Sequence, residues 1–466
     1  MMESRLEERL DALAQSDLYP FHMPGHKRNG PGLFARDITE IDGFDNLHDP
    51  QGILREEMER AAAFYGVRTT HFLINGSTCG ILSAISAAVP AGGSLLTGRR
   101  SHISVYHAAY LRRLQLFYTE EGEPPAQVQA VLVTSPSYEG CVSDIRAWAE
   151  YAHERGAVLI VDEAHGAHFS RHPMFPASAA EEGADLVIQS VHKTLPALTQ
   201  CALLHNVSGR VSDARLEKYL RIYETSSPSY VLMSSMTEAL HGMMDRGISF
   251  FDSYAERLSA LRRKLTELKV LKLAGGADGV LTEDGEIPGF GAGTATDPGK
   301  LVILGGSRLT GAALYETLAG DYHLQPEMKA PGYVLLMTSV GDTQEGYDRL
   351  CRALFEIDRQ LTAAAGESGS CGDGGRGNAA DGNLPVPPRE MTIAEAYDSA
   401  SEEVPLACAE GRISAGFVIV YPPDSPLIVP GERFTGQAVR GIRDCRESGC
   451  TLTGLHGDLA VCVKHN

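Results

Sequence analysis

The chain has 466 residues, of which 43% are hydrophobic, and its 41 basic and 60 acidic side chains give a net charge of −19. These proportions predict a globular protein of about two to four domains. The acidic balance and the lack of a Lys/Arg-rich run argue against nucleic acid as a partner, because phosphate backbones are bound by basic clusters. The sequence has neither a signal-peptide core nor a run of about 18 apolar residues, so we expect a cytoplasmic protein without a membrane partner. Its nine scattered cysteines form no CxxC pair, and we expect them to be reduced.

Residues 1–69 are predicted to form an N-terminal arm and a site-proximal segment, opening with a short amphipathic helix at residues 1–15. From residue 70 onward, short apolar runs alternate with helix-length segments. The apolar runs are 71–74, 94–97, 130–134, 158–162, 186–190 and 202–205. Buried strands that alternate with helices predict a largely parallel sheet, with its ligand site at the carboxyl ends of the strands. This pattern predicts a large domain over residues 70–245.

Two smaller domains are predicted after the large one. A long helical stretch at 249–270 and two further apolar runs predict a small α+β domain over residues 246–363. Residues 364–383 are rich in Gly, Ala and Ser, a composition that predicts a flexible linker. Beyond this segment, turn-rich strands predict a C-terminal α+β domain at residues 384–466.

Two residues at predicted strand ends point to a cofactor. Asp162 ends the run VLIVD, and Lys193 follows the run LVIQS by three residues. Pyridoxal phosphate needs both groups, because a lysine forms the Schiff base with its aldehyde and a carboxylate keeps the pyridine nitrogen protonated. Strand-end Asp and Lys are also common without this cofactor, so the pair alone does not decide the function.

A phosphate anchor is the third requirement, and the segment HFLINGSTCG at 71–80 supplies a candidate. A strand and a glycine turn lead into a helix, where the backbone N–H groups of Ser77, Thr78 and Cys79 would face an anion. An ordinary Ser/Thr helix cap is the alternative interpretation. The order of phosphate cup, aspartate and lysine along the chain favours the cofactor site.

Six motifs in chain order resemble the Orn/Lys/Arg decarboxylase family. They are HMPGHK at 22–27, DNLHDPQG at 45–52, INGSTCG at 74–80, VDEAHGAHF at 161–169, QSVHKTLPALTQ at 189–200 and GRISAGFVIVYPPDSPLIVPGE at 411–432. The resemblance is to the shorter bacterial form, without an N-terminal wing domain. It implies the aspartate-aminotransferase-like α/β fold (pyridoxal-phosphate fold type I), in which the large domain has a mixed, mostly parallel sheet.

The resemblance also implies a function and an assembly. The function is pyridoxal-phosphate-dependent decarboxylation of a basic amino acid to its amine and CO2, in the service of polyamine synthesis. The assembly is a homodimer or a higher oligomer with a shared active site. Arginine is the expected substrate, ahead of lysine and ornithine.

Site residues are carried over by position in the motifs. Lys193 matches the Schiff-base lysine, Asp162 the partner of the pyridine nitrogen, and His102 the imidazole that stacks on the cofactor ring. His192 is the candidate catalytic acid beside Lys193. The rest of the expected cofactor-binding set is Ser77, Thr78, Cys79 and Ser190 at the phosphate, His165 in the pocket, and Ser226 and Ser227, which reach across the dimer interface.

The chain departs from the family pattern at two places. Cys79 stands where a small hydroxyl residue or Gly is usual, and the C-terminal motif has Gly416 for Glu and Asp424-Ser425 for Gly-Ile. A basic substrate also requires an acidic acceptor for its head group. The candidate acceptors are Asp45, Glu327, Glu410 and Asp424.

Other functions fit the sequence less well. DEAH at 162–165 is also a helicase signature, but the chain has no GxxxxGK[ST] phosphate loop. His165, His168 and His172 lack the HExxH spacing of a metal site, so no metal is expected. An aminotransferase or lyase of the same fold type is the alternative enzyme, and a non-catalytic regulatory binding protein is the remaining possibility.

Overall fold

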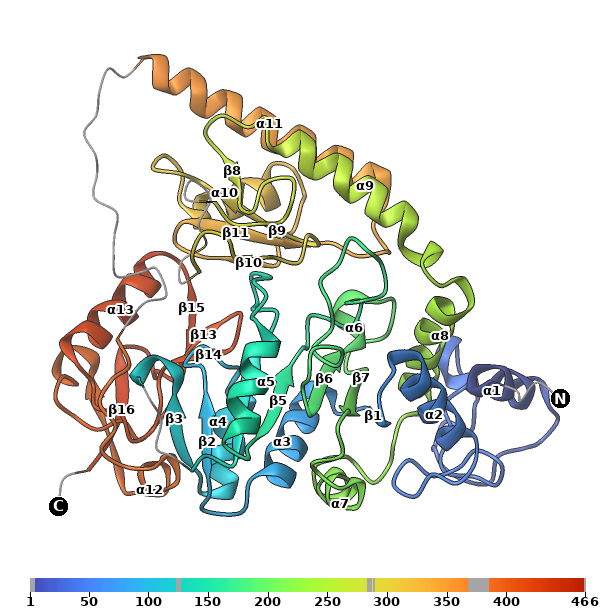
Figure 1. The fold of residues 1–466 in the computed structure, drawn as a ribbon. Coiled ribbons are helices and arrows are strands. Elements are labelled where there is room, and N and C mark those ends of the chain that lie inside the picture. Colours follow the sequence, from blue (N-terminus) through green and yellow to red (C-terminus); the bar gives the residue numbers. More distant parts are fainter. Residues whose placement is uncertain (1–4, 123–126, 283–286, 288–289, 368–384, 465–466) are drawn as a thin grey trace. The chain divides into compact units, whose positions relative to one another are not determined.

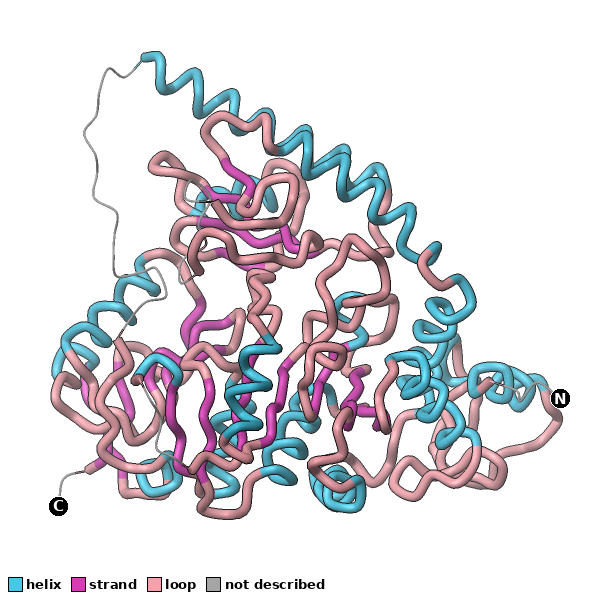
Figure 2. Tube along the Cα trace, viewed as in Figure 1, coloured by secondary structure: helices cyan, strands magenta, loops and turns pink. Residues whose placement is uncertain are grey.

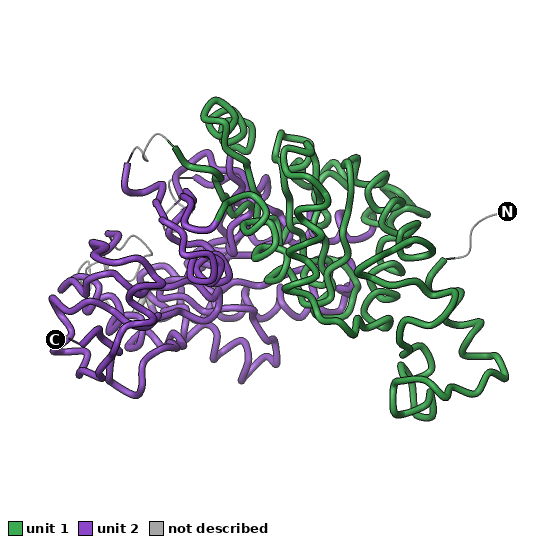
Figure 3. The backbone as a smooth tube through the Cα atoms, turned by 90° about the horizontal axis from the view of Figure 1, so that it is seen from below, with its two compact units in different colours: residues 1–90, 126–135, 144–252 green, residues 91–125, 136–143, 253–466 purple. Residues whose placement is uncertain are grey.

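The computed structural model describes residues 5–122, 127–282, 287, 290–367 and 385–464 (Figure 1). The chain divides into two units that are each discontinuous in sequence (Figure 3). Unit 1 comprises residues 1–90, 126–135 and 144–252, and unit 2 comprises residues 91–125, 136–143 and 253–466. Residues 91–125 of the predicted large domain therefore belong to unit 2.

Unit 1 contains the N-terminal helices and five strands. Its elements are α1 (Leu6–Gln15), η1 (Gly32–Ala35), α2 (Ile53–Tyr65), β1 (Thr69–Leu73), α3 (Gly76–Ala88), β4 (Ala130–Thr134), α5 (Ile145–Glu154), β5 (Val158–Asp162), β6 (Leu186–Ser190), α6 (Val191–Thr194), β7 (Ala202–Asn206), α7 (Asp213–Tyr223) and α8 (Tyr230–Arg246). Helix α9 (Ser249–Leu265) begins here and continues in unit 2.

The strands in the described part of unit 1 hydrogen-bond in the order β1-β7-β6-β5-β4. Strands are drawn in magenta in Figure 2. Strand β5 pairs in parallel with β4 and β6, whereas β7 pairs antiparallel with β6 and β1. Two antiparallel steps give β1 the same direction as β6. The carboxyl ends of β1, β4, β5 and β6 therefore lie at one edge of the sheet, as the sequence predicts.

Helices bury the strands of unit 1, which is why the strands read as continuous apolar runs. Helix α3 packs across β1, β7, β6 and β5, and α5 packs on β4 and β5. Gly80 allows the close approach of α3, because a Cβ at this position would lie 2.6 Å from Leu73 Cδ1 and 3.2 Å from Ile188 Cγ2. The last glycine of the INGSTCG motif thus sets the distance between helix and sheet.

Unit 2 contains the remaining elements. They are β2 (Ser94–Thr97), α4 (Ile103–Arg112), β3 (Gln115–Tyr118), η2 (Thr119–Glu121), β8 (Lys272–Leu273), β9 (Lys300–Leu304), α10 (Gly311–Gly320), β10 (Met328–Lys329), β11 (Tyr333–Met337), α11 (Gln344–Glu367), α12 (Ile393–Tyr397), β12 (Ser401–Pro405), η4 (Leu406–Cys408), β13 (Val418–Tyr421), β14 (Ser425–Ile428), α13 (Gly436–Glu447), β15 (Thr451–Thr453) and β16 (Leu459–Val463).

Unit 2 is built around several small sheets. Strands β2 and β3 pair in parallel, and an antiparallel sheet has the order β10-β11-β9-β8, with α10 packed on β10 and β11. The C-terminal part has the pair β12-β16 and the sheet β14-β13-β15, with α13 against β14 and β15. These elements enclose a core that includes Leu406, Phe434 and Ile442.

The predicted linker lies mostly outside the described residues. Helix α11 continues to Glu367 and so includes the first four residues of the segment 364–383, while residues 368–383 are not described. In the part of the chain that the structure describes, we find no helix that is both long and apolar enough to cross a membrane.

Candidate active site

Asp162 and Lys193 lie at the ends of two neighbouring strands of unit 1, Asp162 within its strand and Lys193 just after its strand. Asp162 is the last residue of β5, and Lys193 lies in the short helix α6 that directly follows β6. Because β5 and β6 are parallel, both residues lie at the same edge of the sheet. Asp162 is only 4% exposed, and its Oδ1 accepts the N–H of Ala164 over 3.2 Å. Burial raises the pKa of Asp162, while the charge of Lys193 and the Ala164 N–H oppose this rise.

Two histidines flank Lys193. Lys193 Nζ lies 3.2 Å from Nε2 of the buried His165. Nδ1 of His192 lies 2.9 Å from the carbonyl oxygen of Cys201, so this nitrogen carries the proton that is donated to the carbonyl. Burial lowers the pKa of His192, which favours the neutral ring. Its Nε2 is then the basic atom.

The start of α3 is the turn that the sequence predicts to bind an anion. The helix begins at Gly76, whose φ of +76° is a left-handed value that favours glycine. Asn75 stands at the cap position without a side-chain cap, because its Nδ2 donates to the carbonyl oxygen of Tyr223 over 3.1 Å. The first-turn N–H groups, which include those of Ser77 and Thr78, have no acceptor within the helix.

Ser190 adds a buried hydroxyl at the end of β6. It is the last residue of β6, against which α3 packs, and it has no exposed surface. Its Oγ has no hydrogen-bond partner among the residues that the structure describes. A buried hydroxyl without a partner is costly unless a ligand binds it.

The thiol of Cys79 has two acceptors within the protein, one of which is the carbonyl oxygen of Gly76 at 3.1 Å. Cys79 Sγ donates to Oε1 of Glu224 over 2.7 Å, and burial together with this carboxylate raises the pKa of the thiol. Glu224 also accepts the N–H of Ile74 over 3.2 Å. Burial raises the pKa of Glu224 too. Sequence reasoning missed Glu224, although it directly precedes the TSSPSY segment, because its partners are about 150 residues away.

The DNLHDPQG motif contacts residues 225–230 in unit 1. His48 of the DNLHDPQG motif has Nε2 2.7 Å from the carbonyl oxygen of Thr225, and Tyr230 Oη donates to the carbonyl oxygen of Asp45 over 2.7 Å. Ser226 and Ser227 lie between these contacts and are exposed, with the Ser227 N–H donating to Thr225 Oγ1 over 3.2 Å. Their expected role at a dimer interface stays a prediction.

His102 belongs to unit 2, where it caps α4. Its Nδ1 accepts the N–H of Ser104 over 3.2 Å and lies 2.8 Å from Ser104 Oγ. Its Nε2 lies 3.8 Å from Oδ2 of Asp424. The segment next to it is fixed to the C-terminal motif by a buried ion pair, in which Arg99 donates to Oε2 of Glu432 over 2.8 Å.

The four candidate acceptors for a basic head group have different surroundings. Asp45 accepts the N–H groups of Gln51 and Gly52 over 2.9 and 2.7 Å. Burial tends to raise the pKa of Asp45, but these backbone bonds lower it. Glu327 accepts from Tyr138 Oη, Glu410 is exposed, and Asp424 faces His102. The oxygens of Asp45 are thus used within its own turn.

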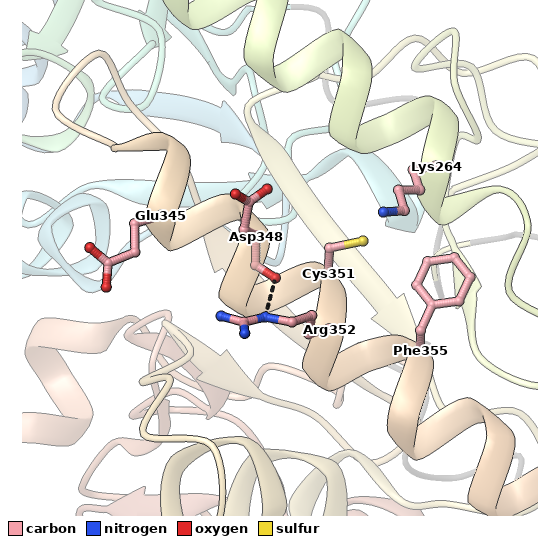
Figure 4. A pocket seen from close by; sticks show the side chains of 6 residues that line it. All are labelled: Lys264, Glu345, Asp348, Cys351, Arg352 and Phe355. Carbon is pink, nitrogen blue, oxygen red and sulfur yellow. Dashed lines mark hydrogen bonds between the residues drawn. The ribbon is translucent and has the colours of Figure 1, made fainter.

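Two hollows in the structure are lined by other residues. In unit 1, a hollow of about 750 Å³ has a lining that includes His48, Asp49 and His71. In unit 2, a hollow of about 650 Å³ lies along α9 and α11 (Figure 4). Its lining consists of Lys264, Glu345, Asp348, Cys351, Arg352 and Phe355. None of these linings contains a residue of the expected cofactor-binding set.

Comparison with protein families agrees with the motifs. The description "Orn/Lys/Arg decarboxylase, major domain" matches residues 9–121 and 119–275, and "Orn/Lys/Arg decarboxylase, C-terminal domain" matches residues 383–460. The chain belongs to the Orn/Lys/Arg decarboxylase family. Membership of this family implies pyridoxal phosphate as the cofactor, and the family predicted from the six motifs is confirmed.

Known relatives cover most of the chain. Arginine decarboxylase of Bacillus subtilis (strain 168) is 28% identical over 93% of this chain and 92% of its own length. Lysine decarboxylase LdcA of Pseudomonas aeruginosa is 25% identical over 94% of this chain and 75% of its own length. The match to these family members therefore extends over nearly the whole chain.

Solved structures of the family share the fold. Lysine decarboxylase A from Pseudomonas aeruginosa has a TM-score of 0.80 at 22% identity and covers 98% of this chain and 80% of its own. The E. coli constitutive lysine decarboxylase has a TM-score of 0.79 at 19% identity, with coverage of 98% and 82%. An alanine–glyoxylate aminotransferase from Nostoc reaches 0.51 over 67% of this chain and 88% of its own, at 15% identity. The predicted fold of this Orn/Lys/Arg decarboxylase family member is confirmed.

Proposed function

We propose that this chain is a pyridoxal-phosphate-dependent decarboxylase of a basic amino acid. The observation that carries the proposal is the buried Asp162 at the same sheet edge as Lys193, in a chain with both decarboxylase domains. The C-terminal domain separates this proposal from the aminotransferase alternative, because the aminotransferase likeness covers only 67% of the chain.

The residues of unit 1 fit the cofactor on three points. Asp162 is a buried carboxylate that would pair with a protonated pyridine nitrogen. The open first turn of α3 and the partnerless Ser190 Oγ would take the phosphate. Lys193 supplies the amine that binds the aldehyde covalently. The family resemblance assigns the ring-stacking imidazole to His102.

Pyridoxal phosphate supplies an electron-accepting ring that takes up the electrons released when the Cα–carboxylate bond breaks. Asp162, when ionised, would hold the proton at the ring nitrogen. After the substrate amine has displaced it, Lys193 would be free to deliver a proton to Cα. His192 is the second candidate for this step, because its Nε2 can carry a proton while Nδ1 remains bonded to Cys201.

Arginine is the proposed substrate, ahead of lysine and ornithine. Relatives named arginine decarboxylase include those of Bacillus subtilis and Halalkalibacterium halodurans, each 28% identical to this chain. A guanidinium prefers a planar carboxylate acceptor, whereas an ammonium accepts a point contact. We propose that the enzyme works as a dimer in the cytoplasm, with the amine product used for polyamine synthesis.

Product formation tests the proposal directly. Purified protein with pyridoxal phosphate is incubated with L-arginine, L-lysine or L-ornithine at equal concentration, and CO2 and amine are measured. We expect arginine to react fastest, and Lys193→Ala to abolish both turnover and borohydride trapping of the cofactor on the protein. A preference for lysine or ornithine would overturn the order of substrates. Conversion only when a 2-oxo acid is added would overturn decarboxylation in favour of transamination.

A further inference from the structure

Two residues of the C-terminal motif contact the segment that carries His102. The carbonyl oxygen of Asp424 accepts the N–H of Ile103 over 3.0 Å, and Ser425 Oγ donates to the carbonyl oxygen of Arg100 over 3.0 Å. Asp424 and Ser425 are the residues that replace Gly-Ile in this chain. The departure from the family motif therefore lies directly against the start of α4.

The ring of His102 has defined surroundings at both nitrogens. Nδ1 accepts the N–H of Ser104, so we assign the proton of the neutral ring to Nε2. Nε2 faces Oδ2 of Asp424 at 3.8 Å, a separation suited to an ion pair and too long for a hydrogen bond. The carboxylate thus faces the nitrogen that carries the proton.

His107, Arg100 and Glu139 are further charged or titratable groups of unit 2 in this region. His107, also on α4, has a pKa lowered by burial, and the charge of Asp424 opposes this change. Burial raises the pKa of Asp424, and His107 opposes the rise. Arg100 donates to Oε1 of Glu139 over 2.8 Å. The Asp424 carboxylate therefore interacts with His102 at the N-cap of α4 and with His107 within the helix.

The backbone at position 424 allows the charge to be removed without strain. Asp424 has a φ of +69°, a left-handed value that Gly, Asn and Asp adopt more readily than other residues. Asn at this position keeps the shape of the side chain, and Gly restores the residue usual in the family. Both substitutions leave the carbonyl oxygen that accepts from Ile103.

We propose that Asp424 is a positioning residue for His102, whose carboxylate orients the Nε2–H edge of the ring and favours its protonated form. The inference rests on the proposed function in one respect, namely that His102 stacks on the cofactor. The charge of the His102 imidazole would then depend on a residue of the C-terminal motif.

The test is hydrogen–deuterium exchange at the imidazole C2–H of His102, followed by mass spectrometry of the holoenzyme across pH. The midpoint of this exchange reports the pKa of the individual histidine and does not require turnover. Two unit charges 3.8 Å apart in largely aqueous surroundings shift a pKa by about 1. We expect Asp424→Asn and Asp424→Gly to lower the His102 midpoint by about one pH unit.

A matched control removes a carboxylate at the other end of the same helix. Asp398 accepts from Tyr110 Oη and pairs with Arg113 over 3.2 Å, so Asp398→Asn should leave the His102 midpoint unchanged. An unchanged midpoint in Asp424→Asn, or a change at His107 alone, would overturn the proposal. A shift in Asp424→Gly but not in Asp424→Asn would assign the effect to the loop backbone and would also overturn it.

Activity measured on the same samples separates this inference from the proposed function. A normal His102 midpoint in an active Asp424→Asn enzyme would overturn only the positioning role. A shifted midpoint in the variants, together with a parent protein that releases no CO2 from any of the three amino acids, would overturn only the decarboxylase proposal.

Discussion

His241 lies between two carboxylates where the N-terminal helix α1 packs on α8. It is 3% exposed on α8, with Nδ1 2.6 Å from Oε1 of Glu7 on α1 and Nε2 2.8 Å from Oε2 of Glu57 on α2. Both ring nitrogens face acceptors, so the ring must be protonated to donate to both. Burial lowers the pKa of His241, but the bonds to Glu57 and Glu7 outweigh this effect and raise it to about 9.

The raised pKa determines how this cluster contributes to stability at each pH. His241 binds its proton more tightly in the folded state than at its ordinary pKa of 6.5. Its contribution is therefore complete below pH 6.5 and is lost as the pH rises towards 9. A difference of about 2.5 pKa units corresponds to about 3 kcal/mol, and solvent screening near the partly exposed Glu7 reduces this to about 2 kcal/mol.

The prediction is tested with His241→Gln, which removes the charge and can donate to only one of the two carboxylates. Urea unfolding at pH 6.0 should show a loss of about 2 kcal/mol relative to the parent protein, and at pH 9.5 the difference should fall below about 1 kcal/mol. The matched control is His456→Gln, because His456 also lies 2.6 Å from a carboxylate, that of Glu403, but is exposed. The control should change stability little at either pH. A His241→Gln difference that is constant or grows with pH would refute the reasoning.

Two further predictions concern the site and the C-terminal domain. The Asp162→Asn variant should keep part of the cofactor but lower turnover by several powers of ten. The reason is that an uncharged side chain cannot hold the proton on the pyridine nitrogen. Near-normal rates of turnover would contradict the role assigned to Asp162. Glu432→Gln should destabilise the protein by about 3 kcal/mol in thermal unfolding, since it leaves Arg99 buried without its ion partner. The control is Glu402→Gln, because Glu402 pairs with Arg412 at a more exposed place. A comparable loss of stability in this control would contradict the argument.

Local sequence was sufficient for the strands of the large domain and for the residues at their ends. Strands β4, β5 and β6 coincide with the predicted runs at 130–134, 158–162 and 186–190. A run of apolar residues buried on both faces has few alternatives to a central strand. Strands that are joined by helices run parallel, so their carboxyl ends lie at the same edge of the sheet. The sequence alone therefore assigns Asp162 and Lys193 to one edge.

Other parts of the fold were harder to predict from local pattern. The sequence pattern does not predict strand β3 at Gln115–Tyr118. This strand has only four residues, and so short a stretch shows no clear alternation of apolar and polar side chains. The start of helix α3 at Gly76 does not follow from apolar spacing, since the first turn of the helix is polar. Sequence pattern reports burial more reliably than it reports where an element begins.

The sequence by itself determined the family and the order of strands β4, β5 and β6, because these depend on residue types at short spacings along the chain. Only the tertiary structure decided which distant residues meet: Cys79 with Glu224, His241 with Glu7 and Glu57, and His102 with Asp424. Each of these contacts depends on burial and on the packing of elements that are far apart in sequence. The protonation state of a buried carboxylate or imidazole follows from such neighbours, so no local pattern specifies it.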